Sequence, residues 1–265
     1  VARVLFEGRR AMGVELASPA PGQPAARDDR DVRELQARSG VLLAAGALQT
    51  PVLLARSGVG HPADLARIGV PVLQASPEVG FNLQDHPYLP LRVDIDTPCD
   101  LNRPGQELFA FFSGLSAAPA PPDEGADSSA AARRVELQLR PSCRPAAAGA
   151  GRTTLTYKVY VILLRGRTSG RVAPRSRDPR DNPAVFFDPF AGDGADAWEL
   201  MRHARDLHPV LESAAGHLKA AARFDPPRDV LLDDVKLAQF CARRLGVWQH
   251  PSATARVGAV VDERL

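Results

Sequence analysis

Short apolar runs open the chain and predict paired strands. Residues 4–6 and 12–16 are rich in β-branched and apolar side chains, and Gly8 lies between them, where a turn needs a flexible backbone. Residues 40–46 are apolar throughout and bounded by glycines, which favours a strand covered on both faces, although a buried helical turn has the same pattern. The first part of the chain therefore has the pattern of an α/β domain.

From residue 89 onward the pattern becomes an alternation of apolar and polar positions. Residues 91–95 and 136–139 alternate in this way, which indicates strands with one face exposed to water. A longer strand is predicted over residues 154–164, and shorter strands over 171–173 and 184–187. This region therefore predicts a mainly antiparallel sheet.

Helices are predicted on both sides of this region. A first pair covers residues 51–56, which begin at Pro51, and residues 62–68. Later helices are expected over 196–207, ending before Pro209, then over 210–222, and over 233–245, ending at Gly246. Asp196 with Glu199 resembles a capping pair at the start of the first of these three.

Two segments lack the apolar content of a core. Residues 17–38 mix proline, alanine, glycine and charges, and predict a surface excursion. Residues 114–134 are rich in Ala, Pro, Ser and Asp, so they bury too little apolar surface to offset the entropy of ordering. We expect this second segment to be a flexible insertion.

Composition narrows the classes of partner. Thirty-three basic and 31 acidic residues give a formal net charge of +2, which gives no electrostatic reason to bind nucleic acid or an anionic membrane. No apolar run approaches the roughly 18–20 residues that a membrane-spanning helix needs. Cys99, Cys143 and Cys241 are far apart and show no metal-ligand spacing, so we expect neither a disulfide framework nor a metal site.

Three segments carry the candidate chemistry. The first, Gly46-Ala-Leu-Gln-Thr-Pro-Val-Leu-Leu-Ala-Arg-Ser-Gly-Val-Gly60, has small residues that let a backbone pass close to a dinucleotide. The second is Gly80-Phe-Asn-Leu-Gln-Asp-His-Pro87, and the third is Trp248-Gln-His-Pro-Ser-Ala-Thr-Ala-Arg-Val-Gly-Ala-Val-Val-Asp262. Taken singly, each has an ordinary alternative: a strand–loop–helix, a self-satisfied polar turn, and a hydrogen-bonded core histidine.

Together, in this order, the three segments resemble the glucose–methanol–choline (GMC) family of flavin-dependent oxidoreductases. The first segment matches the second of the family's characteristic sequence patterns at every position that this pattern specifies. The second segment resembles the family's Gly-x-Asn-Leu-Gln-Asp-His-Pro loop. The third resembles the family's His-Pro-x-x-Thr-x-x-x-Gly pattern, with Val257 in place of the usual methionine and Ala253 where glycine is common. More loosely, Ser169-Gly-Arg-Val resembles part of the family's substrate domain.

The resemblance implies an α/β (α+β) fold with two domains. One is a partial FAD/NAD(P)-binding Rossmann-like domain, and the other is a substrate domain with a mainly antiparallel sheet flanked by helices. We expect residues 1–88 to contribute to the FAD domain, residues 89–247 to form most of the substrate domain, and residues 248–265 to return toward the flavin.

The resemblance also implies a reaction and a set of site residues. FAD is the expected cofactor and a small-molecule alcohol the expected substrate; hydride passes to the flavin N5 while a base takes the hydroxyl proton. An imidazole titrates near neutrality, which suits this task, and His250 falls on the family's catalytic histidine. The expected cofactor-binding residues are Ala45, Gly46, Asn82, Asp85, His86, Gln249 and His250.

Two parts of the family pattern do not occur in the sequence. The Gly-x-Gly-x-x-Gly turn that gathers the pyrophosphate is expected upstream of Val1, and a second catalytic Asn or His is expected beyond Leu265. On this basis we expect the chain to be an internal fragment that binds FAD weakly when alone. A non-catalytic truncated remnant, or a substrate-domain module, is the alternative from another functional class.

Two other branches of the family stay open. Hydroxynitrile lyases use the same scaffold without net redox chemistry. Fatty-acid photodecarboxylases carry a Cys-Arg pair where this chain has Leu164-Arg165, and they lack the histidine that His250 supplies, so both positions favour the oxidoreductase. We expect surface or capping roles for four further histidines, at positions 61, 203, 208 and 217. We expect Arg165, Arg167 and Arg171 to be strand-edge or domain-surface charges rather than a substrate clamp.

Overall fold

The computed structural model describes residues 1–17, 34–99, 108–113, 134–145, 153–217 and 221–264. The chain divides into two compact units. Unit 1 comprises Val1–Gln84, Ser169–Asp188 and Pro251–Leu265, and unit 2 comprises Asp85–Thr168 and Pro189–His250. Contacts thus group residues 169–188 with the N-terminal part of the chain. Each unit is described below by itself.

Unit 1 combines small sheets with two helices. Its helices are α1 (Gly46–Arg56) and α2 (Pro62–Arg67). Its strands form an antiparallel sheet of β1 (Arg3–Glu7), β2 (Arg10–Glu15) and β3 (Glu34–Gln36); a parallel pair of β4 (Val59–Gly60) and β5 (Gln74–Ala75); and an antiparallel sheet of β6 (Phe81–Leu83), β11 (Gly170–Ala173) and β12 (Ala184–Phe186). The predicted strand pair at the start of the chain is confirmed by β1 and β2.

A small core joins α1 to the sheet that contains β6. Val52 of α1 packs with Leu83 of β6 and Val172 of β11, and all three are at most 2% exposed. At Gly80 the backbone has φ +83°, and a Cβ there would lie 2.2 Å from the carbonyl oxygen of Val172. Only glycine fits this close approach, which explains its place at the start of the second motif.

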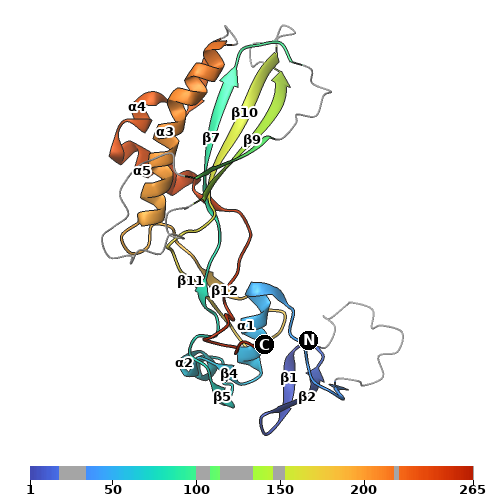
Figure 1. The fold of residues 1–265 in the computed structure, drawn as a ribbon. Coiled ribbons are helices and arrows are strands. Elements are labelled where there is room, and N and C mark those ends of the chain that lie inside the picture. The colour runs from blue at the N-terminus through green and yellow to red at the C-terminus, as the bar shows by residue number, and fades with distance from the viewer. Residues whose placement is uncertain (18–33, 100–107, 114–133, 146–152, 218–220, 265) are drawn as a thin grey trace. The chain divides into compact units, whose positions relative to one another are not determined.

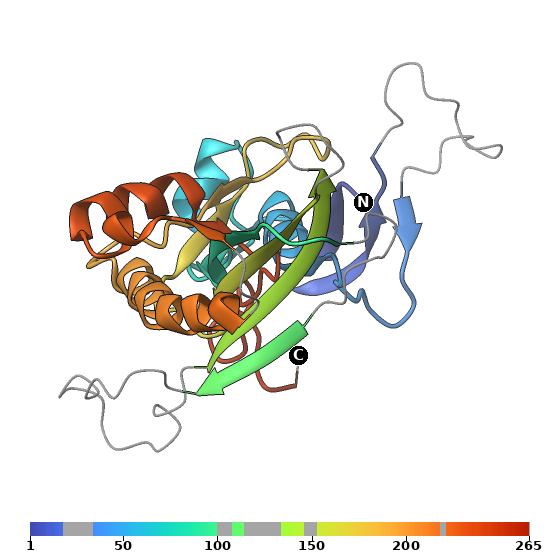
Figure 2. The same ribbon diagram turned by 90° about the horizontal axis from the view of Figure 1, so that it is seen from above.

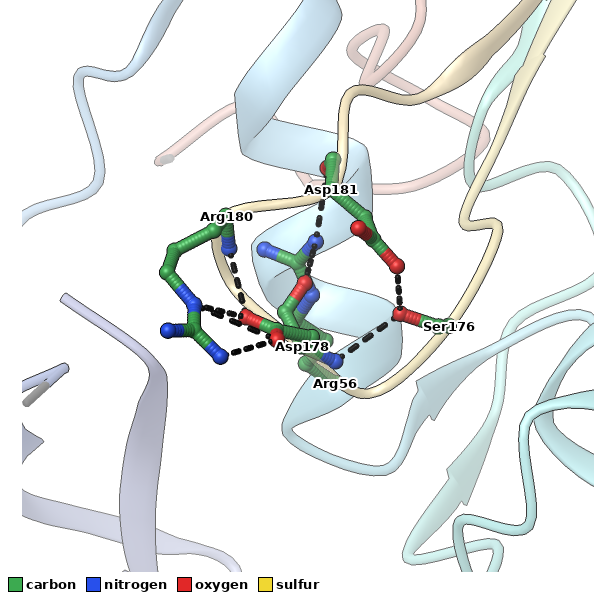
Figure 3. A network of polar contacts seen from close by, with 5 residues as sticks. All are labelled: Arg56, Ser176, Asp178, Arg180 and Asp181. Atoms are coloured by element: carbon green, nitrogen blue, oxygen red, sulfur yellow. Dashed lines mark hydrogen bonds and ion pairs between the residues drawn. The ribbon is translucent and has the colours of Figure 1, made fainter. Parts of the chain in front are cut away.

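A buried arginine at the end of α1 holds the loop between β11 and β12 (Figure 3). Arg56 is 6% exposed, and its Nη2 donates to the carbonyl oxygens of Asp178, at 2.7 Å, and Asp181, at 3.2 Å. Burial lowers the pKa of the Arg56 guanidinium, while Asp178 and Asp181 act in the opposite direction. Hydrogen bonds from Arg180 lower the pKa of the Asp178 carboxyl to about 2. Ser176 donates to Asp181, so the loop is tied internally as well.

Unit 2 is built on one antiparallel sheet of six strands. The order is β13-β7-β10-β9-β8, and β14 also pairs with β7. The strands are β7 (Pro87–Ile95), β8 (Leu108–Ser113), β9 (Arg134–Pro145), β10 (Thr153–Leu163), β13 (Ala222–Asp225) and β14 (Gly246–Val247). The predicted antiparallel sheet is confirmed, with strands that extend beyond the predicted bounds.

Helices cover one face of this sheet. They are α3 (Ala195–His217), α4 (Arg228–Leu231) and α5 (Asp234–Arg244), and Figures 1 and 2 both show α3 and α5 on the same side of the strands. Leu89, Leu91, Val159 and Val161 point into the core on that side, with Leu200 of α3 among their neighbours. Because side chains alternate along a strand, the residues of β7 and β10 that lie between these four have their side chains on the opposite face of the sheet.

Three predictions for the strands and helices are wrong in part. The run over residues 40–46 forms no strand. Leu42 is 92% exposed, and none of the described strands of unit 1 pairs with this run. Helix α1 begins at Gly46, five residues before Pro51. The two helices predicted on either side of Pro209 are one helix, α3, because its core-facing row continues from Leu207 to Ala215 and offsets the hydrogen bond that proline removes.

Other predictions have mixed outcomes. The helix predicted from Asp233 is confirmed, and its carboxylate accepts the N–H groups of Val235 and Lys236. The excursion predicted over residues 17–38 contains strand β3, which pairs with β2. The insertion predicted at 114–134 lies outside the described residues except for Arg134. No described helix is long and apolar enough to cross a membrane.

The absence of disulfides was predicted wrongly. Cys99 and Cys143 form a disulfide, with their Cα atoms 5.8 Å apart. Sequence separation hid this pairing, because Cys99 follows the end of β7 and Cys143 lies in β9, two strands away across β10. The third cysteine, Cys241, is buried in α5, and burial raises the pKa of its thiol to about 12. Cys241 is therefore an inert core residue.

We expect the double variant Cys99→Ser/Cys143→Ser to be less stable by about 2–4 kcal/mol, because the crosslink restricts the unfolded chain. Thermal unfolding with and without reductant measures the effect. Reduction should lower the melting temperature of the parent protein toward that of the double variant and leave the variant unchanged. If the melting temperature of the parent protein stays the same when its disulfide has been fully reduced, the disulfide does not stabilise the fold.

Asp196 supports the turn that follows β10. It is 1% exposed, and its carboxylate oxygens accept the backbone N–H groups of Arg167, at 2.7 Å, and Thr168, at 2.8 Å. A Cβ on Gly166 would lie 2.7 Å from one of these oxygens. We predicted that Asp196 would cap α3 together with Glu199. Its carboxylate instead binds the backbone of the turn at Arg167 and Thr168.

We therefore expect Asp196→Ala to destabilise the protein by about 1–3 kcal/mol, because two N–H groups lose a buried, charged acceptor. Chemical denaturation measures the change. Asp206→Ala is the matched control, since Asp206 lies on the same helix and is exposed. Equal stability of the two variants would show that the turn does not depend on Asp196.

Candidate active site

One carboxylate holds both histidines of the candidate site in unit 2. Asp85 lies just before β7, and its Oδ1 accepts the backbone N–H of His86, at 2.7 Å, and of His250, at 3.0 Å. The imidazole rings of His86 and His250 meet edge to face, with centroids 5.5 Å apart. Residues 165 positions apart in sequence are therefore fixed side by side.

The segment that carries His250 reaches this place by pairing with β7. Strand β14 pairs Gly246 with Tyr88, and the N–H of Trp248 then donates to the carbonyl oxygen of His86 at 2.9 Å. A Cβ on Gly246 would lie 2.7 Å from the ring of Tyr88, so this position also requires glycine. The pairing fixes the register of the residues that follow.

Gln249 turns the chain between Trp248 and His250. Its φ is +62°, a left-handed conformation that non-glycine residues adopt rarely. The side chains of Gln249 and His250 are both exposed. The imidazole of His250 is thus accessible to a small molecule, while its backbone N–H is held by Asp85.

Sequence reasoning missed an aromatic cluster beside these residues, formed by Tyr88, Tyr160 and Trp248. Each pair of rings meets edge to face, with centroid distances between 5.0 and 5.5 Å. The guanidinium carbon of Arg140 lies 5.6 Å from the ring centre of Tyr160 and 5.5 Å from that of Trp248. Tyr88 alternates with the core residues of β7, and that alternation is the sequence signal that places it on the face opposite the helices.

Three predicted residues lie in unit 1. Ala45 and Gly46 are exposed at the start of α1, where no side chain caps the helix and no acidic residue occupies the first turn. A Cβ on Gly46 would meet no atom within 4 Å, so its surroundings are open. Asn82 has φ +58° and accepts a hydrogen bond from Ser169 Oγ at 3.3 Å.

Residues 251–254 join the second motif to α1 within unit 1. Thr254 donates from Oγ1 to the carbonyl oxygen of Ala47 at 2.6 Å, and its own carbonyl accepts the N–H of Gly80 at 2.9 Å. Ala253 has φ +68°, which explains why the family often has glycine at this position. The other departure, Val257, is 56% exposed, so no core depends on it.

The structure thus brings the predicted residues together in two groups. Asp85, His86, Gln249 and His250 lie together in unit 2, and their catalytic or cofactor-binding roles stay predictions. Ala45, Gly46 and Asn82 belong to unit 1. No group of residues suited to a metal ion occurs within the described ranges.

The histidines outside the motifs have structural positions. His61 accepts the N–H of Ala63 at the start of α2, as predicted, and His217 is exposed near the end of α3. The surface role predicted for His203 and His208 is wrong, because they are 3% and 7% exposed. Arg171 pairs with Asp64 and its guanidinium lies 4.5 Å from the ring centre of Phe81, so it is an internal contact of unit 1 rather than a surface charge.

Comparisons with protein families agree with the motifs. Family models described as GMC oxidoreductase match residues 1–88 and 166–265. The chain is 30% identical to oxygen-dependent choline dehydrogenase of Pseudomonas syringae pv. tomato, over 98% of the chain and 47% of that protein. The corresponding protein of Cronobacter sakazakii is 28% identical, over 98% of the chain and 48% of the relative. The chain therefore spans about half the length of the curated relatives it matches.

Solved structures give the same fold. A formate oxidase of Aspergillus oryzae, in a study of its FAD modification, superposes with a TM-score of 0.70 at 22% identity, covering 98% of this chain and 52% of that one. Pyridoxine 4-oxidase from Mesorbium loti superposes with a TM-score of 0.59 at 24% identity, covering 100% and 49%. At these identities the likeness concerns the fold alone.

We expect Asp85→Ala to loosen the chain at both histidines, because two N–H groups lose one charged acceptor, each such bond contributing about 1.5–3 kcal/mol. Hydrogen–deuterium exchange over residues 85–88 and 246–250 measures this, and exchange should be faster in both. Asp85→Asn keeps an acceptor oxygen and should retain more protection. Unchanged exchange in the alanine variant would contradict the proposed anchoring.

Proposed function

The chain belongs to the glucose–methanol–choline family of oxidoreductases, and we propose that it serves an FAD-dependent enzyme that oxidises the CH–OH group of a small-molecule alcohol. His250 is the base in this proposal. One observation carries this proposal: the side chain of His250 is exposed, while its backbone N–H is held by Asp85. The coverage of about half of each relative supports a role within a longer enzyme.

The proposed reaction separates an alcohol into a proton, a hydride and a carbonyl product. The imidazole of His250 takes the hydroxyl proton, the O–H electron pair forms the new C=O bond, and hydride leaves the adjacent carbon. FAD, when bound, supplies the acceptor for that hydride. An accessible histidine suits the proton transfer because imidazole gains and loses protons near neutral pH.

The surroundings of His250 favour a fixed orientation of its ring. Asp85 holds the backbone N–H, and the ring of His86 packs edge-on against the ring of His250. Orientation of a base toward the reacting proton reduces the entropy lost on the way to the transition state. In the proposed enzyme Asp85 is a positioning residue, since its bonds are to backbone groups.

Residues of unit 1 fit the binding of FAD. The start of α1 has free space around Gly46 and neither a side-chain cap nor an acidic residue in its first turn. Small residues with open space around them let a cofactor approach the backbone closely. We propose that Ala45, Gly46 and Asn82 of unit 1 are FAD-binding residues. For unit 2 we propose the same role for Asp85, His86, Gln249 and His250.

His250→Ala should slow flavin reduction by alcohol about 10²–10⁴-fold, the range for loss of a general base. Anaerobic stopped-flow absorbance of the FAD-loaded protein, with a panel of primary alcohols, measures the rate. Excess FAD is present throughout and each rate is expressed per bound flavin, so that a slower reaction is distinguished from a loss of cofactor. His217→Ala is the matched control, since this exposed histidine lies on α3 outside the motifs.

The outcomes separate the remaining alternatives. Flavin reduction at the parental rate in His250→Ala would overturn the role of His250. A protein that retains flavin, cleaves a cyanohydrin and is not reduced by any alcohol would be a lyase. Absence of FAD binding in an equilibrium titration with excess FAD would favour the non-catalytic alternative.

A further inference from the structure

Arg140 occupies the place where a cationic substrate would bind against the aromatic cluster. A cation binds the electron-rich face of an aromatic ring within about 6 Å of its centre. The guanidinium carbon of Arg140 already lies 5.6 Å from the ring centre of Tyr160 and 5.5 Å from that of Trp248. The structure therefore uses the attraction of these rings for a cation within the chain itself.

The aromatic cluster belongs to the same small region as His250. Trp248 lies two residues before His250, and its N–H donates to the carbonyl oxygen of His86, whose ring meets that of His250. Tyr88 follows His86 by two residues and packs edge to face on Trp248. All of these residues are in unit 2, so their arrangement is internal to one compact unit.

The face of the sheet that bears the cluster also carries further positive charge. Strand pairing places Arg92, Lys158 and Arg140 directly opposite one another across β7, β10 and β9. Asp94 binds Arg92 through two contacts, from Nε at 2.8 Å and Nη2 at 2.7 Å, and also accepts from Thr156. Lys158, in the middle of the row, is exposed. A second cation placed beside Lys158 and Arg140 would meet like charges. The carboxylates on this face are farther along the strands or already bound: Glu136 is four residues from Arg140 on β9, and Asp94 binds Arg92.

We propose that Arg140 determines the charge of the substrate, so that the site accepts uncharged alcohols and rejects quaternary-ammonium alcohols. The proposal rests on the alcohol oxidation proposed above and adds the substrate class. The hydrocarbon part of an uncharged alcohol packs against the edges of Tyr88, Tyr160 and Trp248, and the guanidinium of Arg140 does not oppose it. Relatives named choline dehydrogenases would then differ from this chain in the charge that they accept.

Choline and 3,3-dimethylbutan-1-ol form a matched pair of probes, because they have the same shape and differ in a nitrogen cation against a carbon. We expect the FAD-loaded protein to bind the uncharged alcohol at least about tenfold more tightly than choline, the size expected for one desolvated charge contact. Calorimetric titration of protein loaded with reduced FAD, under anaerobic conditions, measures both affinities without turnover, because reduced flavin accepts no hydride. If Arg140 had a purely structural role, substituting it would change the affinities for both probes by the same factor.

Substitutions test whether Arg140 is responsible. Arg140→Gln should reduce the preference by about tenfold, and Arg140→Lys should keep most of it, because a cation remains beside the rings. Arg144→Gln is the control: Arg144 lies on the same strand and the same face, and is exposed, so the preference should not change. If Arg140→Gln does not fold, Arg140→Met takes its place, because it keeps a long side chain without the charge and should reduce the preference equally.

Each outcome bears on the proposal. Equal binding of the two probes by the parental protein overturns it, and so does preferential binding of choline or binding of neither probe. An unchanged ratio in Arg140→Gln also overturns it. The alcohol-oxidation proposal is tested separately by flavin bleaching, so a protein that prefers the uncharged probe but shows no reduction of flavin would lose the reaction and keep the site.

Discussion

Strand β7 carries the constraint on which unit 2 depends, because its two rows of side chains serve different purposes. Leu89, Leu91 and Val93 must fill the core beneath α3 and α5, so they fix the register of the strand. Once that register is fixed, Tyr88 necessarily lies on the opposite face, two residues after His86. A slip of one residue would exchange the core and the candidate site at once.

The constraint extends to the C-terminal part of unit 2 through pairing and one carboxylate. Strand β14 pairs with the first residues of β7, and β13 pairs with its last residues. Gly246 fits beside Tyr88 only because it has no side chain. Asp85 then fixes the backbone of His250. The position of the proposed base is therefore a consequence of sheet pairing, which explains how a side chain on an exposed segment is held without being buried.

Sequence predicted those elements whose pattern is local. The alternation in β7 and β10, the strand pair at the start of the chain and the helix capped by Asp233 depend on neighbouring residues, and they form as expected. The errors concern partners distant in sequence. A buried strand over residues 40–46 needs neighbouring strands, the helix through Pro209 needs a core, and the disulfide of Cys99 needs β9 beside it.

The candidate site shows the same division. Motif spacing identified Asp85, His86 and His250, and the structure places them in contact. The aromatic cluster with Arg140 lies on four segments, so no single motif contains it. Pairing across strands was the missing information.

Backbone conformation supports the view that the motif segments are shaped for a site. The non-glycine residues with positive φ in the described structure are Asn82, Gln249 and Ala253, and all lie in the second or third motif. Such conformations cost about 1–3 kcal/mol for ordinary residues, so surrounding bonds must hold them. Asp85 and Thr254 supply such bonds beside Gln249 and Ala253. Strain that folding alone does not require is concentrated where the proposed chemistry occurs.

The family supplies a scaffold and a type of reaction, whereas the substrate depends on individual side chains. The chain is 30% identical to a choline dehydrogenase, yet the rings beside its His250 already contact a guanidinium. A cationic substrate gains little from rings whose faces a fixed cation already occupies, and it meets repulsion from that cation. The charge on the sheet face is therefore a more direct guide to the substrate of this chain than the names of its relatives.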